Sequence, residues 1–311
     1  MKAALCIFRM SKASRMTSAA APAVPWVHSP DLEAHLSRSQ ASPSAAAFAR
    51  DLARDGLAII DLGEDMAALC DQAIAETESM FRDDRVGRVH EAWRRSPAVR
   101  AIAGLPDLKA LLALAYGRAP FAFQTINFKR GSQQDPHADS MHFQSRPAGF
   151  MCGVWVALED VRPGAGPLIY YPGSHRLSPK ARSAGDATID TYHHHHGDAL
   201  AADLEAHGLA AQPAMLRKGQ VAVWAADLAH GGSPIADPGS TRRSLVIHFY
   251  FEDCLYYTPM HSKSDRPATR LPARVGGGWV WPRRDGRRAP VPVKAFGAAV
   301  INRLLRRTRA F

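Results

Sequence analysis

A histidine and a carboxylate two residues apart, His137 and Asp139, are the first side chains of this sequence that could hold a metal ion together. In an extended segment, residues i and i+2 point to the same face, so the imidazole and the carboxylate can reach a common point. The best candidate for a third ligand is His230, between Ala229 and Gly231. Two histidines and one carboxylate on one face of an octahedron leave three positions open, which is the ligand set of non-haem Fe(II) oxygenases.

The third-ligand position has one serious rival, His248. On the strand expected around it, His248 shares a face with Arg242 and points inward. His142 lies five residues after the first histidine of the pair, and an extended segment would place it on the opposite side. From residue types and spacing alone the third ligand therefore stays open, with His230 preferred.

Two other histidine-bearing stretches receive structural interpretations. His175 ends the segment 172–175, Pro-Gly-Ser-His, and is expected to fix a turn. The run His193–His196 invites a second metal site, but neighbouring histidines on one segment cannot all converge on one ion. We interpret the run as a polar lid loop within an insertion over residues 176–213, which is longer than most connections and is the natural lid over a substrate.

Arg242 is expected to bind a carboxylate of a ligand. It lies where a turn rich in Pro, Gly and Ser leads into a strand of β-branched and aromatic residues. An iron oxygenase that uses 2-oxoglutarate needs a fixed cation for the far carboxylate of this cosubstrate. A guanidinium binds a carboxylate through two parallel hydrogen bonds, and the hydroxyl of Ser244, on the same face, can add a third. Strand alternation sends Arg243 to the opposite face.

Five short segments occur in a specific order over roughly residues 120 to 252, a little under half of the chain. They are Pro136-His137-Ala138-Asp139, residues 153–160, Gly166-Pro167-Leu168 leading to Pro172-Gly173-Ser174-His175, Ala229-His230-Gly231, and Arg242-Arg243-Ser244-Leu245 leading to His248-Phe249. In these segments the sequence resembles the phytanoyl-CoA dioxygenase family of Fe(II)- and 2-oxoglutarate-dependent oxygenases.

The resemblance implies a fold, cofactors and residue roles. The fold is mainly β with flanking helices, around a double-stranded β-helix of the cupin-like jelly-roll type. The cofactors are Fe(II), 2-oxoglutarate as cosubstrate, and O₂. The iron ligands are His137, Asp139 and His230, and the cosubstrate residues are Arg242, Ser244, Trp155 and Gln124.

The expected reaction is hydroxylation of an unactivated C–H bond in a small-molecule metabolite, with release of succinate and CO₂. Asp139 favours hydroxylation over halogenation, because related halogenases lack this carboxylate and leave room for chloride, while desaturation and ring chemistry stay open. One alternative is a non-catalytic jelly-roll protein that binds a metal or ligand. A second is a nucleic-acid demethylase with the same ligand set, but such relatives carry a second arginine six residues after the first, where this chain has His248.

The charge of the chain is concentrated in its last part. The 311 residues carry a formal charge of +10, yet residues 262–311 alone hold 13 Lys and Arg against two Asp. The body is therefore nearly neutral, and we expect no nucleic-acid partner, although the basic tail could make weak contact with an anionic surface. No apolar run is long enough to cross a membrane. Four widely spaced cysteines favour a reducing, cytoplasmic location.

Three regions are expected along the chain. Residues 1–43, rich in Ala, Ser and Pro, predict a disordered leader. Residues 44–262 are expected to form the oxygenase domain, whose jelly-roll core covers about 120–252 and begins near residue 120. Residues 263–311 predict a basic tail that ends in an amphipathic helix over 293–311. The expected helices are 44–55, capped by Ser44 and stopped by Gly56, 66–81, and 105–116; the expected strands are 57–62, 121–128, 150–158, 167–171, 214–217, 220–226 and 243–251; and residues 82–97 are expected to form an exposed loop.

Overall fold

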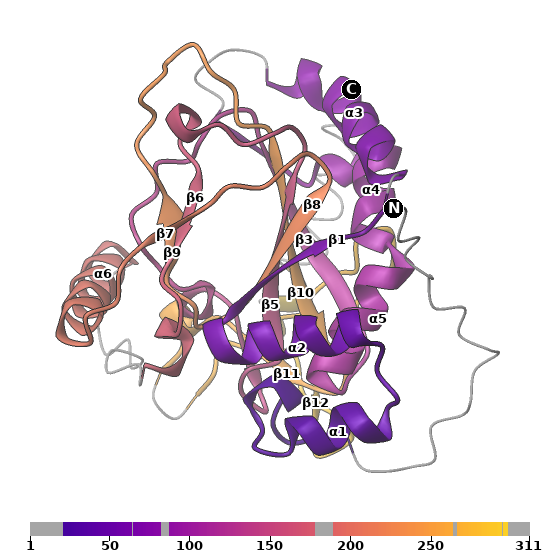
Figure 1. The fold of residues 1–311 in the computed structure, drawn as a ribbon. Helices are drawn as coiled ribbons and strands as arrows, with labels where there is room; N and C mark the ends of the chain where they lie inside the picture. Colours follow the sequence, from indigo (N-terminus) through magenta and orange to yellow (C-terminus); the bar gives the residue numbers. More distant parts are fainter. Residues whose placement is uncertain are drawn as a thin grey trace.

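Two antiparallel sheets face each other in the computed structural model, which describes residues 21–63, 65–81, 87–177, 189–263, 266–293 and 295–297, and the side chains of these except 189–195. The major sheet has the strand order β1-β8-β5-β10-β3-β2, and the minor sheet has the order β7-β6-β9. Figure 1 shows the two sheets enclosing the centre of the molecule. This is the jelly-roll architecture expected from the sequence.

The strands differ widely in length, and helices separate several of them. Their bounds are β1 Leu57–Asp61, β2 Arg88–His90, β3 Pro120–Phe128, β4 Gln144–Arg146, β5 Met151–Ala157, β6 Leu168–Tyr170, β7 Gln212–Ala214, β8 Gln220–Ala225, β9 His230–Gly232, β10 Ser244–Phe251, β11 Leu255–Tyr257, β12 Arg283–Arg284 and β13 Arg287–Arg288. The central strands were predicted well, because β5 and β10 are apolar runs that are buried along almost their whole length.

Helices cover the outer face of the major sheet (Figure 1). The α-helices are α1 Leu32–Arg38, α2 Pro43–Asp55, α3 Asp65–Thr77, α4 Pro97–Gly104, α5 Pro106–Tyr116 and α6 Ile189–Ala206. Residues 245, 247 and 249 of β10 pack with α2 to α5 in the larger hydrophobic cluster. A smaller cluster, which includes Trp155 and Trp224, fills the space between the two sheets. The two faces of the major sheet thus have separate cores.

The N-cap of helix α2 lies two residues before the expected one. The hydroxyl of Ser42, not Ser44, accepts the hydrogen bond from the backbone N–H of Ala45 at 3.3 Å, so Ser42 is the N-cap. The predicted stop is confirmed, because Gly56 has a φ of 76° and its N–H bonds to the carbonyl of Leu52. A side chain at Gly56 would also collide with the ring of His175.

The expectation of a disordered leader through residue 43 is wrong for its described part. Residues 21–43 include the 3-10 helix η1, Trp26–His28, and helix α1. The side chains of Val27, Leu32 and Leu36 are buried in the larger cluster. A few well-spaced apolar residues therefore outweigh the Ala, Ser and Pro around them, and residues 1–20 lie outside the described part of the chain.

Several elements differ from their expected form. Residues 82–97 were expected to be a loop, but β2 and the 3-10 helix η3, Ala92–Arg94, occupy their described portion. Helix α4 was not predicted, and the strand expected at 214–217 lies slightly earlier as β7. The barrel was expected to begin near residue 120, yet β1 pairs with β8 and completes one edge of the major sheet. Short or partly polar strands escape a pattern based on alternation.

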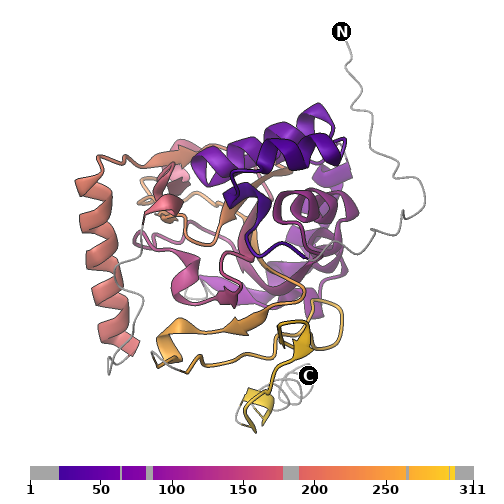
Figure 2. The same cartoon turned by 90° about the horizontal axis from the view of Figure 1, so that it is seen from below.

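The insertion over 176–213 contains helix α6 rather than only a loop. Figure 2 shows α6 on one side of the sheets, with the β12–β13 hairpin on a separate side. In the described part of the chain no helix has the length and apolarity needed to cross a membrane. The expected C-terminal helix over 293–311 lies mostly outside the described residues.

Candidate active site

Backbone hydrogen bonds hold the two candidate histidine ligands beside each other. The N–H of His137 donates to the carbonyl of His230, and the N–H of His230 donates to the carbonyl of His137, both at 2.9 Å. Gly232 donates to Gln134 in the same way, and a side chain at Gly231 would come within 2.7 Å of the Gln134 carbonyl oxygen. This close approach requires glycine after His230, which gives a physical reason for the His-Gly-Gly sequence.

The expected triad comes together in space. One ligand atom each from His137, Asp139 and His230 lies within 4.8 Å of the other two. The expected extended strand is not what positions them, because His137 forms an isolated bridge and Asp139 begins the 3-10 helix η4, Asp139–Met141. From this turn, Oδ1 of Asp139 comes to 3.9 Å from Nε2 of His230. Among the described residues this is the one group of three that could hold a metal.

The tautomers of both histidine rings suit metal binding. Nδ1 of His137 lies 2.8 Å from the carbonyl oxygen of Asp135, and Nδ1 of His230 lies 3.0 Å from that of Leu228. A carbonyl oxygen only accepts, so each Nδ1 carries the proton and each Nε2 keeps its lone pair. Burial lowers the pKa of His230 to about 4, against an opposing effect of Asp139. His230 is therefore a neutral imidazole at neutral pH, which is the form that binds metals.

The two oxygens of Asp139 have different surroundings. Oδ1 lies 3.9 Å from Nε2 of His230, on the side where a metal would sit. Oδ2 accepts a hydrogen bond from the indole N–H of Trp224 at 2.8 Å and lies 3.4 Å from Nε2 of His248. Burial opposes ionisation of this carboxyl, but His248, His230 and His137 hold the pKa of Asp139 well below its usual range. The carboxylate is thus ionised and offers Oδ1 to a cation.

A row of residues across the major sheet supports Asp139. Gln124 on β3, His248 on β10, Gly153 on β5 and Trp224 on β8 are successive cross-strand partners. Such partners share one face of the sheet. A Cβ at Gly153 would lie 2.2 Å from the ring of Trp224, so only glycine leaves room for the indole. The row therefore brings both His248 and Trp224 to the same carboxylate oxygen.

His248 is a neighbour of the candidate metal site and not a member of the three-residue group. Its Nδ1 lies 2.9 Å from Oε1 of Gln124, which fixes the ring, while its Nε2 faces Asp139. The structure thus favours His230 over His248 as the third ligand. Gln124, expected to contact the cosubstrate, is engaged with His248.

Arg242 is a buried cation with incomplete hydrogen bonding. Its residue is 3% exposed, and its Nη1 donates to the hydroxyl of Ser244 at 3.1 Å. Its Nε has no hydrogen-bond partner, and no carboxylate of the described residues lies within ion-pair distance of its guanidinium. Burial lowers the pKa of Arg242 to about 10, which still leaves it charged at neutral pH. A buried cation is costly without an anion, so the pocket fits a ligand carboxylate.

Aromatic rings flank this guanidinium. The Cζ of Arg242 lies 5.4 Å from the ring centre of Trp155 and 5.9 Å from that of Phe128. Trp155 is 1% exposed and lies on the inner face of β5, opposite Val246. The structure therefore places Trp155 beside the expected anchor. Aromatic walls exclude water and strengthen a charge-assisted hydrogen bond.

Arg243 points to the other face, as strand alternation predicts, but it is not a solvated surface charge. Its guanidinium pairs with Glu78 and lies 3.8 Å from Glu159, and its side chain is 17% exposed. Its backbone N–H also donates to Glu159 at 2.7 Å. Arg243 therefore connects the strand to the end of the α3 region and has no path to the inner pocket.

A cavity of about 840 Å³ opens at His137 and is covered on one side by α6. His142 lines it, contrary to the expectation that this ring would face away. From the four-histidine run, His196 reaches the cavity, and the side chains of the other three lie outside the described set. His175 instead packs in the turn Ser174–Arg176, where its Nε2 lies 3.2 Å from the carbonyl of Ala53.

Sequence reasoning missed two supporting residues, Trp224 and Gly153. Neither residue has a sequence feature nearby that would indicate its role. Trp224 is 85 positions from Asp139, and Gly153 is one small residue within an apolar strand. A glycine inside a strand does signal that another group approaches closely, and this rule could have drawn attention to Gly153.

Known proteins resemble the chain in sequence and in fold. The sequence pattern of the phytanoyl-CoA dioxygenase family matches residues 42–244. Phytanoyl-CoA dioxygenase domain-containing protein 1 from Mus musculus is 31% identical over 90 residues, which cover 28% of this chain and 31% of that protein. The aligned part thus spans less than a third of the mouse relative.

Two solved structures share the fold. The non-heme alpha-ketoglutarate-dependent carbocyclase SnoK from nogalamycin biosynthesis has a TM-score of 0.54 and 18% identity, covering 71% of this chain and 88% of its own. EctD from S. alaskensis, solved with 2-oxoglutarate and 5-hydroxyectoine, has a TM-score of 0.52 and 19% identity, covering 70% and 79%. At this identity the likeness concerns the fold. Because the family pattern covers about two thirds of the sequence, the chain belongs to the phytanoyl-CoA dioxygenase family.

Proposed function

We propose that this protein is an Fe(II)- and 2-oxoglutarate-dependent dioxygenase that hydroxylates an unactivated C–H bond of a small molecule. The observation that carries the proposal is the combination of a two-histidine, one-carboxylate group with a buried and incompletely bonded arginine, Arg242. Family membership supports the same cofactors. The balanced reaction consumes the substrate, 2-oxoglutarate and O₂, and it yields the hydroxylated substrate, succinate and CO₂.

The residues of the candidate site have different proposed roles. His137, Asp139 and His230 would hold Fe(II), which with 2-oxoglutarate and O₂ supplies the oxidising power. Trp224 keeps Oδ2 of Asp139 in a hydrogen bond, which directs Oδ1 to the metal. Arg242 would bind the far carboxylate of 2-oxoglutarate, and Ser244 orients the guanidinium. The same face of the sheet thus positions both cofactors.

The charge of the cavity narrows the substrate class. Its described lining includes Asp135, Asp198, Asp203 and Asp227, and it includes no Lys or Arg. The carboxylates of Asp135 and Asp198 are exposed and repel phosphates, so they disfavour a coenzyme A thioester and also a nucleic-acid strand. A neutral or cationic small molecule with polar groups fits better. The acidic lining therefore supports the small-metabolite proposal over the demethylase alternative.

Anaerobic titration and succinate release test the proposal in two steps. Adding 2-oxoglutarate to the Fe(II)-loaded protein should produce a metal-to-ligand charge-transfer absorbance that is absent in Asp139→Ala. In air, substrate candidates should then stimulate succinate release, with amines and polyols ahead of coenzyme A thioesters. Binding of 2-oxoglutarate without succinate from any candidate would favour a non-catalytic ligand-binding protein. Failure to bind either Fe(II) or 2-oxoglutarate would reject the proposed site.

A further inference from the structure

Four arginines lie on one short hairpin, β12–β13, at the lower edge of the view in Figure 2. The groove beside this hairpin shares no lining residue with the cavity at His137. The register of the hairpin places Arg283 opposite Arg288 and Arg284 opposite Arg287. Asp285 and Gly286 form the two-residue turn with positive φ angles of 50° and 73°. Both central residues with positive φ are typical of a type I′ turn, which fits a tight hairpin.

The pairing of like charges in this hairpin is unfavourable. Cross-strand partners of the same sign repel, and a hairpin of two strands is marginally stable on its own. In the described chain β12 and β13 pair only with each other. One arginine pair is relieved, because Arg283 lies 3.3 Å from Asp253 and Arg288 stands over the ring of Trp281 at 5.7 Å. Among the described residues, the other pair, Arg284 and Arg287, has no ion pair or ring contact of this kind.

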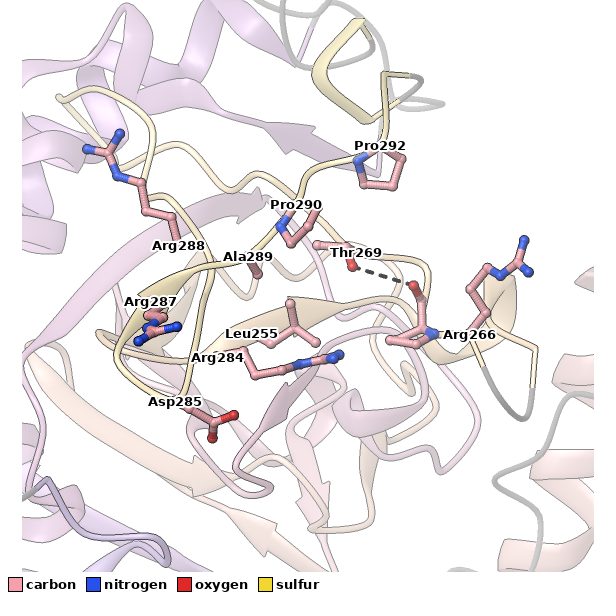
Figure 3. Close-up of a pocket in the computed structure, with 11 residues that line it drawn as sticks. Leu255, Arg266, Thr269, Arg284, Asp285, Arg287, Arg288, Ala289, Pro290 and Pro292 are labelled. Atoms are coloured by element: carbon pink, nitrogen blue, oxygen red, sulfur yellow. Dashed lines mark hydrogen bonds between the residues drawn. The ribbon is translucent and has the colours of Figure 1, made fainter.

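The unrelieved pair lines a surface groove of about 750 Å³. Figure 3 shows Arg284 extending along the groove beneath Leu255, in the direction of Arg266. Within the described ranges, no carboxylate lies within ion-pair distance of Arg266, Arg284 or Arg287. The N–H of Arg283 donates to the carbonyl of Cys254, which holds the hairpin to the domain, and the N–H of Ala289 donates to the carbonyl of Pro282, which closes the hairpin base. The described lining of the groove holds four arginines, at positions 266, 284, 287 and 288, against one carboxylate, Asp285, so its net charge is positive beside apolar residues such as Leu255.

Exposed apolar residues continue from the same groove. Val293 is 86% exposed, and Phe296 is 40% exposed although its ring also packs against Trp279, with 5.5 Å between the ring centres. Both follow Pro292, a residue of the groove wall. Basic side chains next to exposed apolar ones are typical of surfaces that lie on a membrane interface. The terminal stretches of the chain, residues 1–20 and 298–311, contain basic residues and no acidic ones, so their charge does not complement the groove.

We propose that this surface docks the protein on a bilayer that carries anionic phospholipid. Arg266, Arg284 and Arg287 meet the headgroup phosphates and carboxylates, and Val293 with Phe296 enters the interface. A nucleic acid is the less suitable partner, because single strands stack their bases on open aromatic rings and Trp281 is already covered by Arg288. The docking is peripheral and reversible, and it leaves the cavity at His137 open to a small substrate.

Vesicle flotation of the full-length chain tests this proposal. The wild type should float with phosphatidylcholine vesicles that contain phosphatidylserine and remain behind with phosphatidylcholine alone. Each basic residue near an anionic surface contributes a roughly fivefold gain, so the double variant R284Q/R287Q should reduce the partition coefficient by roughly 20- to 30-fold. The matched control R54Q/R217Q removes the same charge from two exposed arginines elsewhere and should reduce it less than about threefold.

Three outcomes would overturn the docking proposal. These are no flotation of the wild type with anionic vesicles, equal losses in the two double variants, and stronger binding to a short RNA than to the vesicles. Val293→Ser should weaken flotation while leaving its salt dependence unchanged, which separates the apolar from the ionic contribution. Far-ultraviolet circular dichroism and thermal unfolding of each variant ensure that a loss of flotation reports the surface and not the fold.

Discussion

The two faces of strand β10 have the same backbone but opposite chemistry. On the inner face, Ser244 and His248 lie in line with Arg242, and they carry the polar contacts of the candidate site. On the outer face, Leu245 and Ile247 pack among the helices in the larger cluster. A change on the inner face should therefore alter ligand binding more than stability, whereas a change on the outer face should do the reverse.

On the inner face, the residues that contact Asp139 and the residues that surround Arg242 lie in different cross-strand rows. The row through His248, Gly153 and Trp224 ends at Asp139. Two residues further along β5, Trp155 pairs with Val246 of β10, and its ring lies 5.4 Å from the guanidinium of Arg242. Variants in the first row should weaken Fe(II) binding, and variants around Arg242 should weaken 2-oxoglutarate binding.

The largest expected effect follows from removing a ligand. Asp139→Ala loses the one anionic ligand of the triad, and His230→Ala loses a neutral imidazole. Each should reduce Fe(II) affinity by at least about 100-fold, beyond the range observed for supporting residues, and abolish 2-oxoglutarate turnover. Chelator competition under anaerobic conditions measures the affinity. Near-normal iron binding in either variant would remove that residue from the triad.

Gly153→Ala should be nearly as damaging, although it adds a single methyl group far from the ligand atoms. The methyl would displace the ring of Trp224 and with it the hydrogen bond to Asp139. We expect a roughly 10- to 100-fold loss of Fe(II) affinity, the range for supporting residues. Trp224→Phe removes the N–H without adding bulk and should show the same direction.

Gly104→Ala is the matched control for Gly153→Ala. Gly104 ends α4, and a Cβ there would meet no heavy atom within 4 Å. This variant should keep wild-type iron affinity and thermal stability. Equal behaviour of the two glycine variants would mean that the packing of Trp224 does not control Asp139.

Arg242→Ala should weaken 2-oxoglutarate binding by roughly 30-fold or more, because loss of the partner of a buried carboxylate costs about 2–5 kcal/mol. Arg242→Lys should restore binding only in part, since lysine cannot form paired hydrogen bonds. Ser244→Ala, which leaves the guanidinium but removes its 3.1 Å contact, should fall between wild type and Arg242→Ala. Titration of the anaerobic Fe(II) protein, followed by charge-transfer absorbance, measures all three dissociation constants. Unchanged affinity in Arg242→Ala would move the anchor elsewhere.

His248→Ala tests the boundary between a ligand and a supporting residue. His248 contacts Oδ2 of Asp139 and not the candidate metal position, so Fe(II) affinity should fall by about tenfold, less than for His230→Ala. The two variants should be compared by the same chelator competition. A reversed order, with His248→Ala the more damaging, would restore His248 as the third ligand.

The parts of the fold and of the candidate site that depend on neighbouring residues in the sequence could be predicted. The spacing of Arg242 and Ser244, and the apolar run of β10, predict both the strand and its inner face. The resemblance to the family, together with the spacing of the residues, selects His137, Asp139 and His230 as the candidate ligands. By contrast, the support of Asp139 by Trp224 depends on a contact across 85 positions, which no local periodicity contains. Long-range packing of this kind decides the geometry of the site after the strands have formed.

The N-terminal part shows a different reason for failure. Composition dominated the prediction for residues 21–43, although Val27, Leu32 and Leu36 are enough to dock η1 and α1. Short elements gain their stability from tertiary packing, and their own propensities are weak evidence. Local pattern also failed at Asp139. This residue begins a 3-10 helix and not the expected strand, and its carboxylate lies beside His230.

The smallest effect on ligand binding is expected for Arg243→Ala, the neighbour of the proposed anchor. Arg243 lies on the outer face and pairs with Glu78 and Glu159, so it cannot reach a ligand between the sheets. The dissociation constant of 2-oxoglutarate should change less than about threefold, while the free energy of unfolding should fall by about 0.5–1 kcal/mol, as is usual for partly exposed ion pairs. Urea unfolding of the metal-free protein and the charge-transfer titration measure the two quantities separately. Glu78→Gln should lower the free energy of unfolding at least as much without changing the dissociation constant, because it removes the pair with Arg243 and also the pair of Glu78 with Lys129. If Arg243→Ala instead weakened 2-oxoglutarate binding as much as Arg242→Ala, the side-chain alternation along β10 would not separate cosubstrate binding from helix packing.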